Sequence, residues 1–418
     1  MELGIKDLWK KAKTALNLGL ILVSLNQGCI SQKDTQNLKQ PVAEATEISK
    51  EMPKRKLILD FQNPIENFEA NSSLWFTANQ IAGKGNDLLG IKCGLDENLL
   101  GRIALLSLDF YTDHITTITS HELSHIREGK ESNIYSVKFE LNSFDFTQNF
   151  PGRFKNTPTI EQDLREKIAG LNQNEYNSYI LFKNNLDTLT FDNGITFLVT
   201  KFLDSYYNLS NRHKADEGDV KQYIALLNQK DINLSRKEYL AQTLIADLLS
   251  FYTYDSLSSI GNYLLTGERT TDVTPLNIGS TELTPPLINH YLTTNGSFYN
   301  ITTVINPQGE HPLELSLGTD IDFIGDGNVD RLRFGGQYHQ INLGKGKHAP
   351  KISPFVYCNF NKSFDPKGIS LGTELAIPLT KSSYISIKAD YDKNDILENR
   401  IKGKDNGFNI TGNFTIDF

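Results

Sequence analysis

The C-terminal segment 408–418 alternates strictly between two kinds of side chain. Phenylalanine, isoleucine and one glycine fall on one face, and asparagine, threonine and aspartate fall on the other. Because successive side chains of a strand point to opposite faces, this pattern predicts a strand with one apolar and one polar surface. The same alternation recurs at 313–323, 369–379 and 385–391.

Turn-forming residues separate these alternating segments. Clusters of glycine, asparagine, aspartate and proline stand at 306–309, 325–328 and 365–368. Residues 285–418 therefore predict an antiparallel, barrel-like domain of about eight strands, near the minimum for a closed membrane barrel. The alternation leaves open whether lipid or a core covers the apolar face, so a soluble β-sandwich or a sheet packed on helices remains an alternative.

The preceding part of the chain predicts mainly helices. From Thr159 to Gly267 the apolar spacing is helical, and Ser235 with Glu238 forms a capping box at one helix start. Short strands are predicted at 57–61, 74–78 and 102–110. The predicted fold class is thus α+β, with a mainly helical domain and a few strands before it, followed by the antiparallel domain.

The stretch His121-Glu122-Leu123-Ser124-His125 carries the most specific chemistry. Apolar residues at helical spacing surround it, so it is expected on a helix. Two imidazoles four residues apart then share one helix face and can hold one metal ion, and Glu122 can take a proton from a water on that metal. With only 8 histidines in 418 residues, chance gives this pattern on the order of 0.01 times per chain. The alternative is a half-exposed helix that merely carries these residues.

This stretch resembles the zincin superfamily of metallopeptidases. The resemblance implies that His121 and His125 bind Zn²⁺, that zinc polarises the scissile carbonyl, and that Glu122 is the catalytic general base. The metzincin continuation is absent, because Gly129 comes one position late and Glu131 stands where a third histidine would be.

A catalytic zinc normally takes three protein ligands, so a third is expected. The stretch Asn174-Glu175-Tyr176-Asn177-Ser178 resembles the NExxS part of the gluzincin signature, although Tyr179 replaces the usual acidic residue and the gap from His125 is long. The resemblance implies Glu175 as the third metal ligand. The rivals for this role are Glu131, Glu161, Glu166 and His213.

The N-terminus is typical of export. Four lysines precede an apolar run at 16–25, which is too short to span a bilayer and typical of a signal peptide. The residues before Cys29 resemble a loose lipobox, so Cys29 is a candidate for lipidation. The predicted division is a signal at 1–29, a polar linker at 30–55, a zincin-like domain at 56–284 and the antiparallel domain at 285–418.

Composition and the chain end complete the sequence-based picture. A net charge of −8 gives no electrostatic reason to bind nucleic acid. A terminal strand that ends on an aromatic residue resembles that of bacterial outer-membrane β-barrels, which implies a cell-envelope location, in the outer membrane or periplasm. The predicted function is a zinc-dependent metallopeptidase that acts on a peptide or an envelope protein. The alternative is a non-enzymatic outer-membrane pore or binding module with a structural metal site.

Overall fold

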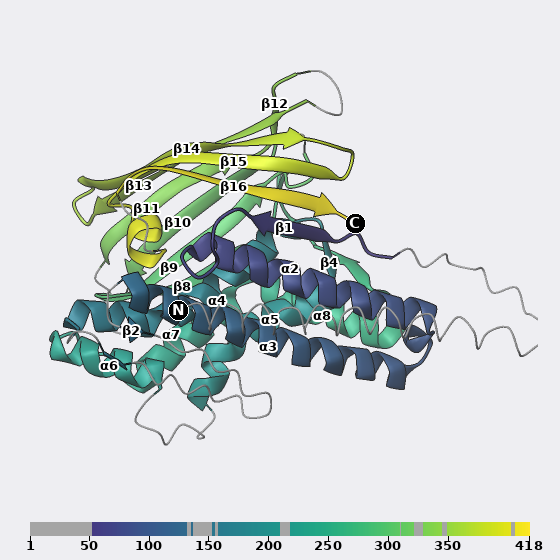
Figure 1. The fold of residues 1–418 in the computed structure, drawn as a ribbon, viewed down its shortest axis with the longest axis horizontal. Coiled ribbons are helices and arrows are strands. Elements are labelled where there is room, and N and C mark those ends of the chain that lie inside the picture. Colours follow the sequence, from purple (N-terminus) through teal and green to yellow (C-terminus); the bar gives the residue numbers. More distant parts are fainter. Residues whose placement is uncertain are drawn as a thin grey trace, which may run out of the picture.

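The computed structural model describes residues 52–131, 135–136, 153–154, 158–209, 218–309, 311–321, 329–344, 349–402 and 406–418. A layer of helices lies beneath one large, curved antiparallel sheet (Figure 1). The predicted α+β class is confirmed, with most helices preceding the sheet along the chain. The predicted signal segment, its Cys29 and most of the linker lie outside the described residues.

Among the described residues, the helical layer contains seven α-helices and several short helical turns. The helices are α2 (Phe68–Asp87), α3 (Leu99–Glu131), α4 (Ile160–Asn184), α5 (Phe191–Leu209), α6 (Asp219–Gln229), α7 (Arg236–Leu249) and α8 (Tyr252–Thr266). The short turns are η2 (Leu88–Lys92), η3 (Leu95–Glu97) and η4 (Ile396–Ile401). Ser235 and Glu238 form the expected capping box at the start of α7. None of the helices among the described residues has the length and apolarity that crossing a bilayer requires.

Two of the predicted strands are wrong, because residues 74–78 lie inside α2 and residues 102–110 lie inside α3. Both segments are short apolar runs, for which the spacing of apolar residues does not separate strand from buried helix. In α3 the buried positions recur every four residues, at Leu105, Asp109 and Asp113. Several of these buried positions are polar, so the helical period is hidden when only apolar residues are counted.

The sheet contains strands from both ends of the described chain. Its order is β1-β16-β15-β14-β13-β11-β10-β9-β7-β6, with β12 beside β13 and β8 beside β9. The strands are β1 (Lys56–Asp60), β6 (Leu276–Ile278), β7 (Thr281–Leu283), β8 (Leu287–Thr293), β9 (Gly296–Ile305), β10 (Leu313–Ile321), β11 (Val329–Tyr338), β12 (Ile341–Asn342), β13 (Lys351–Asn361), β14 (Pro366–Pro378), β15 (Ser383–Lys393) and β16 (Gly407–Asp417). Two small sheets pair β2 (Tyr135–Ser136) with β3 (Arg153–Phe154) and β4 (Thr188–Thr190) with β5 (Thr270–Asp272).

The antiparallel domain was predicted as a barrel-like unit of about eight strands, and the structure corrects this. The sheet has 12 strands and is open, since β1 and β6 end its path without pairing to each other. The strand β1, predicted at 57–61, pairs with the terminal strand β16. At the margins of the sheet, β1 packs on α2 and β8 packs on α4. A helix therefore covers the β1 end of the sheet, whereas the side chains of β6 at the other end are exposed.

The apolar core lies where the helices meet the first strands of the sheet. Trp75 and Phe76 of α2 pack with Phe182 of α4, Leu287 of β8 and Val304 of β9. A second cluster joins Phe68 and Tyr176 to Tyr291, Phe298 and η4. Beside the second cluster, a polar cavity of about 230 Å³ lies between the sheet and the helices, with Tyr176 and Tyr291 in its lining. The packing therefore places α3 and α4 against each other on the side remote from the sheet's outer face.

Candidate metal centre

A buried polar network fixes α3 against α2 and α4. The Asn71 side chain donates from Nδ2 to the Ser120 carbonyl oxygen at 2.8 Å, and Asn177 donates from Nδ2 to Ser120 Oγ at 3.0 Å. Ser124 Oγ donates to Gln173 Oε1 at 2.6 Å. Because a shift of α3 by one residue would break all three hydrogen bonds in a buried place, this network sets which α3 side chains face α4.

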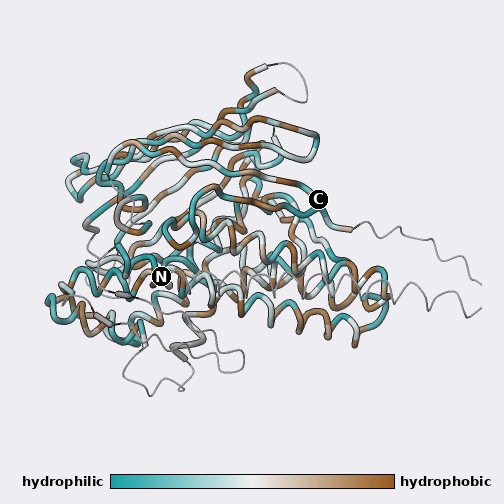
Figure 2. Tube along the Cα trace, viewed as in Figure 1, coloured by the Kyte–Doolittle hydropathy of each residue, from teal (hydrophilic) through white to brown (hydrophobic). Residues whose placement is uncertain are grey.

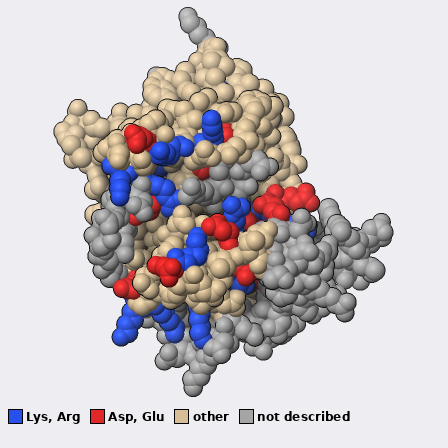
Figure 3. Space-filling view, turned by 90° about the vertical axis from the view of Figure 1, so that its left-hand side faces the viewer, with Lys and Arg blue, Asp and Glu red and all other residues tan. Residues whose placement is uncertain are grey.

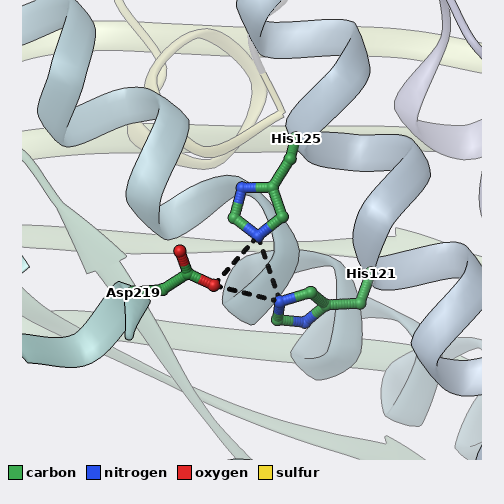
Figure 4. A group of neighbouring side chains, drawn as sticks. All are labelled: His121, His125 and Asp219. Carbon is green, nitrogen blue, oxygen red and sulfur yellow. Dashed lines mark hydrogen bonds and ion pairs between the residues drawn. The ribbon is translucent and has the colours of Figure 1, made fainter. Parts of the chain in front are cut away.

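His121 and His125 lie on that face and point toward each other and toward Asp219 (Figure 4). Their Nε2 atoms are 3.0 Å apart. Asp219 Oδ2 lies 3.2 Å from His125 Nε2 and 3.5 Å from His121 Nε2. Asp219 is the first residue of α6, so its carboxylate also lies at the positive end of a helix dipole.

These three donor atoms fit one metal ion. In a tetrahedral site with bonds of about 2.0–2.1 Å to nitrogen and oxygen, neighbouring donors are about 3.3 Å apart. The observed separations of 3.0, 3.2 and 3.5 Å bracket that value. Two imidazoles and one carboxylate are also a ligand set typical of catalytic zinc, in which the fourth position is left to water. The geometry and the donor chemistry therefore both suit zinc.

The outer nitrogen atoms of both rings have partners in α4. His125 Nδ1 is 2.6 Å from the backbone carbonyl oxygen of Glu166, an acceptor that requires the proton to be on Nδ1. With its proton held on Nδ1, the ring can offer the Nε2 lone pair to a metal once the proton on Nε2 is lost. His121 Nδ1 lies 3.1 Å from the side-chain amide of Asn174. The Glu166 carbonyl therefore orients His125 and raises its basicity, while the Asn174 amide nitrogen, a donor, fixes the orientation of the His121 ring.

Gly170 of α4 provides the space for His121. A Cβ atom built at this glycine would lie 2.4 Å from His121 Cδ2 and Nε2, which is closer than any ordinary contact. Any other residue at position 170 would push against the ring that forms one corner of the site. The glycine therefore allows α4 to approach α3 closely enough for the imidazole to reach the cluster.

The charges of the cluster balance one another. Burial lowers the pKa of the His125 imidazole, but Asp219, Glu166 and Glu122 raise it by more, to about 10. Burial raises the pKa of Asp219, and the two histidines lower it by more, so it falls below its usual value. A metal cation would take the place of the imidazolium proton in pairing with this carboxylate.

Glu122 lies beside the cluster rather than in it. Burial raises the pKa of its carboxyl, and the nearby His125 and His121 partly offset this rise. The side chain is only partly buried. A carboxylate made more basic by its surroundings and close to a bound water is suited to accept a proton.

The structure does not bring Glu175 to the two histidines. Its carboxylate instead forms a buried ion pair with Lys201 of α5, and Asn289 Nδ2 of β8 donates to the same oxygen at 2.9 Å. Among its rivals, Glu161 pairs with Lys230 at 2.9 Å and Glu131 lies 3.8 Å from Arg127. Glu166 contributes its carbonyl oxygen and has a carboxylate oxygen 3.7 Å from His125 Nδ1. His213 lies outside the described residues.

Asp219 stands where Glu175 was expected. Known metallopeptidase signatures downstream of His125 have no spacing that points to Asp219. The one local signal is Gly218-Asp219 at a helix start, a common arrangement that has no metal specificity. Its proximity to the histidines arises from the packing of α6 on α4.

A second acidic group lies inside the sheet, among the described residues. Asp390, Asp392 and Glu398 each place a carboxylate oxygen within 4.8 Å of the others. Lys388 Nζ is 3.1 Å from Asp390, and Lys402 Nζ is 3.0 Å from Glu398. Lysines thus already neutralise part of this group, and it contains no imidazole, so the histidine cluster is the better candidate for a transition metal.

Comparisons with known proteins add nothing to this geometry as a basis for inferring function. The chain matches no family model, no curated protein and no solved structure.

Proposed function

We propose that this protein is a zinc-dependent hydrolase that cleaves peptide bonds. His121, His125 and Asp219 bind the metal, and Glu122 is the general base. The single observation that carries the proposal is that three donor atoms from two helices meet at separations of 3.0 to 3.5 Å, with Glu122 on the adjacent helical position. The resemblance to zincins supports peptide hydrolysis over other hydrolytic reactions, because the site itself does not define the bond that is cut.

The residues divide the chemistry between them. A bound zinc ion would polarise the scissile carbonyl and lower the pKa of a bound water. Glu122 accepts the water proton and passes it to the leaving amine, a role worth about 10²–10⁴-fold in rate. The Glu166 carbonyl holds His125 in the tautomer that binds metal, and Asn174 lies against the outer nitrogen of His121. The expected substrate is a peptide or a protein of the bacterial cell envelope.

A second candidate function is favoured by the cavity under the sheet. Glu314, Arg333, Lys388 and Lys402 line this space of about 230 Å³ together with polar groups of the strands. In this alternative the protein is a non-enzymatic module of the outer membrane that binds a polar ligand, and a metal at His121 and His125 serves only for stability.

Metal content and hydrolysis measured on the same preparations distinguish the two candidates. The full chain is loaded with zinc, dialysed, and assayed by elemental analysis and by release of amines from a mixed peptide pool. We expect one zinc per chain in the unmodified protein. Asp219→Ala is expected to lose zinc and activity, while Glu122→Gln keeps zinc and loses about 10²-fold or more of the rate.

The matched control is Glu161→Gln, which makes the same chemical change at an exposed carboxylate paired with Lys230. It is expected to keep both zinc and activity. Zinc retained in Glu122→Gln with an unchanged rate would remove Glu122 from catalysis and favour the structural metal. An absence of stoichiometric zinc in the unmodified protein would overturn the proposal.

A further inference from the structure

The polarity of the two faces of the sheet is the reverse of that expected for a sheet whose inner face packs on an apolar core. One row of paired positions runs across seven strands on the outer face, and its members are apolar or small. These positions are Thr303, Leu315, Gly336, Val356, Leu371, Tyr391 and Phe408. Val356 is 50% exposed and Phe408 is 68% exposed. The outer face therefore presents large apolar side chains to the surroundings.

The neighbouring row on the inner face is mainly polar. Its members are Val304, Glu314, Gln337, Phe355, Gly372, Asp390 and Asn409. Glu314, Gln337 and Asp390 are buried, and the first two line the cavity between the sheet and the helices. A sheet that faces water on its outer side shows the reverse pattern, with apolar side chains inward.

Charge is absent from the outer face over long stretches. In the described strands β9, β10, β13 and β16, no outward position carries a lysine, arginine, aspartate or glutamate. Figure 2 shows apolar positions recurring along the strands of the sheet. In the end view of Figure 3, the uppermost part of the molecule, which the sheet forms, shows no charged side chains, and these begin below it.

Strand length points in the same direction. The strands β9, β10, β11, β13, β14, β15 and β16 contain 10, 9, 10, 11, 13, 11 and 11 residues. Strands of globular proteins most often have about 5–6 residues, whereas a strand that crosses the hydrocarbon of a bilayer needs about 9–11. Seven neighbouring strands of this length, apolar outward and polar inward, match the geometry of a lipid-facing sheet.

We propose that the outer face of this sheet lies against the hydrocarbon of a lipid bilayer. The sheet is curved over the helical layer, so its outer face is convex (Figure 1). A second copy of the same convex face would touch it over a few strands only, whereas fluid lipid chains can cover all of it. Packing of β1 on α2 covers one margin of the sheet, and β8 packs on α4 beside β9. This inference stands independently of the metal centre.

Vesicle flotation of the full chain tests the proposal. The protein is mixed with vesicles of phosphatidylcholine and phosphatidylglycerol and floated at high salt, which screens purely electrostatic binding. We expect the unmodified chain to float with the vesicles. Ile387→Lys places a charge on an outward position of β15 and is expected to lower the partition coefficient by about 30-fold or more.

The matched control is Gln229→Lys, which adds the same charge at an exposed position of α6. It is expected to float like the unmodified chain. Failure of the unmodified chain to float would overturn the proposal, as would equal flotation of the Ile387→Lys variant. Sedimentation without lipid provides a further check: a dimer that Ile387→Lys dissociates would assign the face to a second copy and overturn the lipid assignment.

Discussion

The helical layer and the sheet both bury polar side chains, but they do so in different ways. In the helical layer, Lys201 lies between Glu175 and Asp247, and all three side chains are almost completely excluded from solvent. On the inner face of the sheet, Lys388 lies beside Asp390 and Glu69 and its side chain is 23% exposed at the cavity. The first network is dry and the second borders a polar space.

This difference predicts where the molecule tolerates the substitution of a charged residue. A dry network of charges is stable only if every charge keeps its partner, because no water molecule can replace a lost partner. A network beside a polar cavity can be solvated from that side, so the loss of one member is less costly. The candidate metal centre lies in the helical layer, between α3, α4 and α6, but it is open to solvent on one side, since the Asp219 side chain is 31% exposed.

The largest expected effect comes from breaking the dry network. Lys201→Met leaves Glu175 and Asp247 buried without their cation, and we expect a loss of about 3–5 kcal/mol in the free energy of unfolding. The matched change in the sheet, Lys388→Met, is expected to cost about 1 kcal/mol. Urea denaturation of both variants measures the difference. Equal losses in the two variants would contradict the distinction between the regions.

A smaller effect is expected from the close approach of α4 to His121. Gly170→Ala places a methyl group where the His121 ring lies, and we expect zinc affinity to fall by about 10–100-fold, as for other changes that misplace a ligand. The control is Gly261→Ala in α8, where a Cβ atom meets nothing within 4 Å. Competition with a zinc-binding dye measures both. Unchanged affinity in Gly170→Ala would mean that the ring position at His121 is not needed for binding.

Parts of this arrangement could be predicted from local sequence. The terminal strand β16 was predicted because eleven residues alternate without interruption, and the helix through His121 and His125 was predicted because its apolar spacing is helical around the motif. Both signals come from residues close together in the chain. The open sheet packed on helices was only an alternative to the expected barrel, because alternation defines the two faces of a strand but does not define what covers either face.

The third residue of the candidate site could not be predicted for the same reason. Asp219 is 94 positions beyond His125, and it reaches the site because α6 packs on α4. Glu175 has the spacing of a known signature, yet Lys201 and Asn289 hold it elsewhere. Which of two acidic residues reaches a metal depends on tertiary packing and on buried counter-charges, and neither is visible as a local pattern.

His290 allows a finer test where the two regions meet. It lies on β8, between the helices and the rest of the sheet, with Thr243 Oγ1 at 3.2 Å and Ser297 Oγ at 2.9 Å from its ring nitrogens. Burial, with a contribution from the nearby Lys201, lowers its pKa from 6.5 to about 3. The folded protein therefore keeps this ring neutral at pH values where the unfolded chain binds a proton.

The sign of the pH dependence follows from that lowered pKa. Because the unfolded state binds more protons between about pH 6.5 and 3, stability is retained above this window and falls as the pH decreases through it, by up to about 1.4 kcal/mol per pH unit. His290→Gln removes this contribution but leaves all other groups in place. The free energy of unfolding, measured by urea denaturation in the presence of a chelator at pH 7 and pH 5, should therefore decrease less in the variant than in the unmodified protein. An identical decrease in both proteins would mean that His290 can take up a proton in the folded state, and that water reaches the seam between helices and sheet as readily as it reaches the cavity.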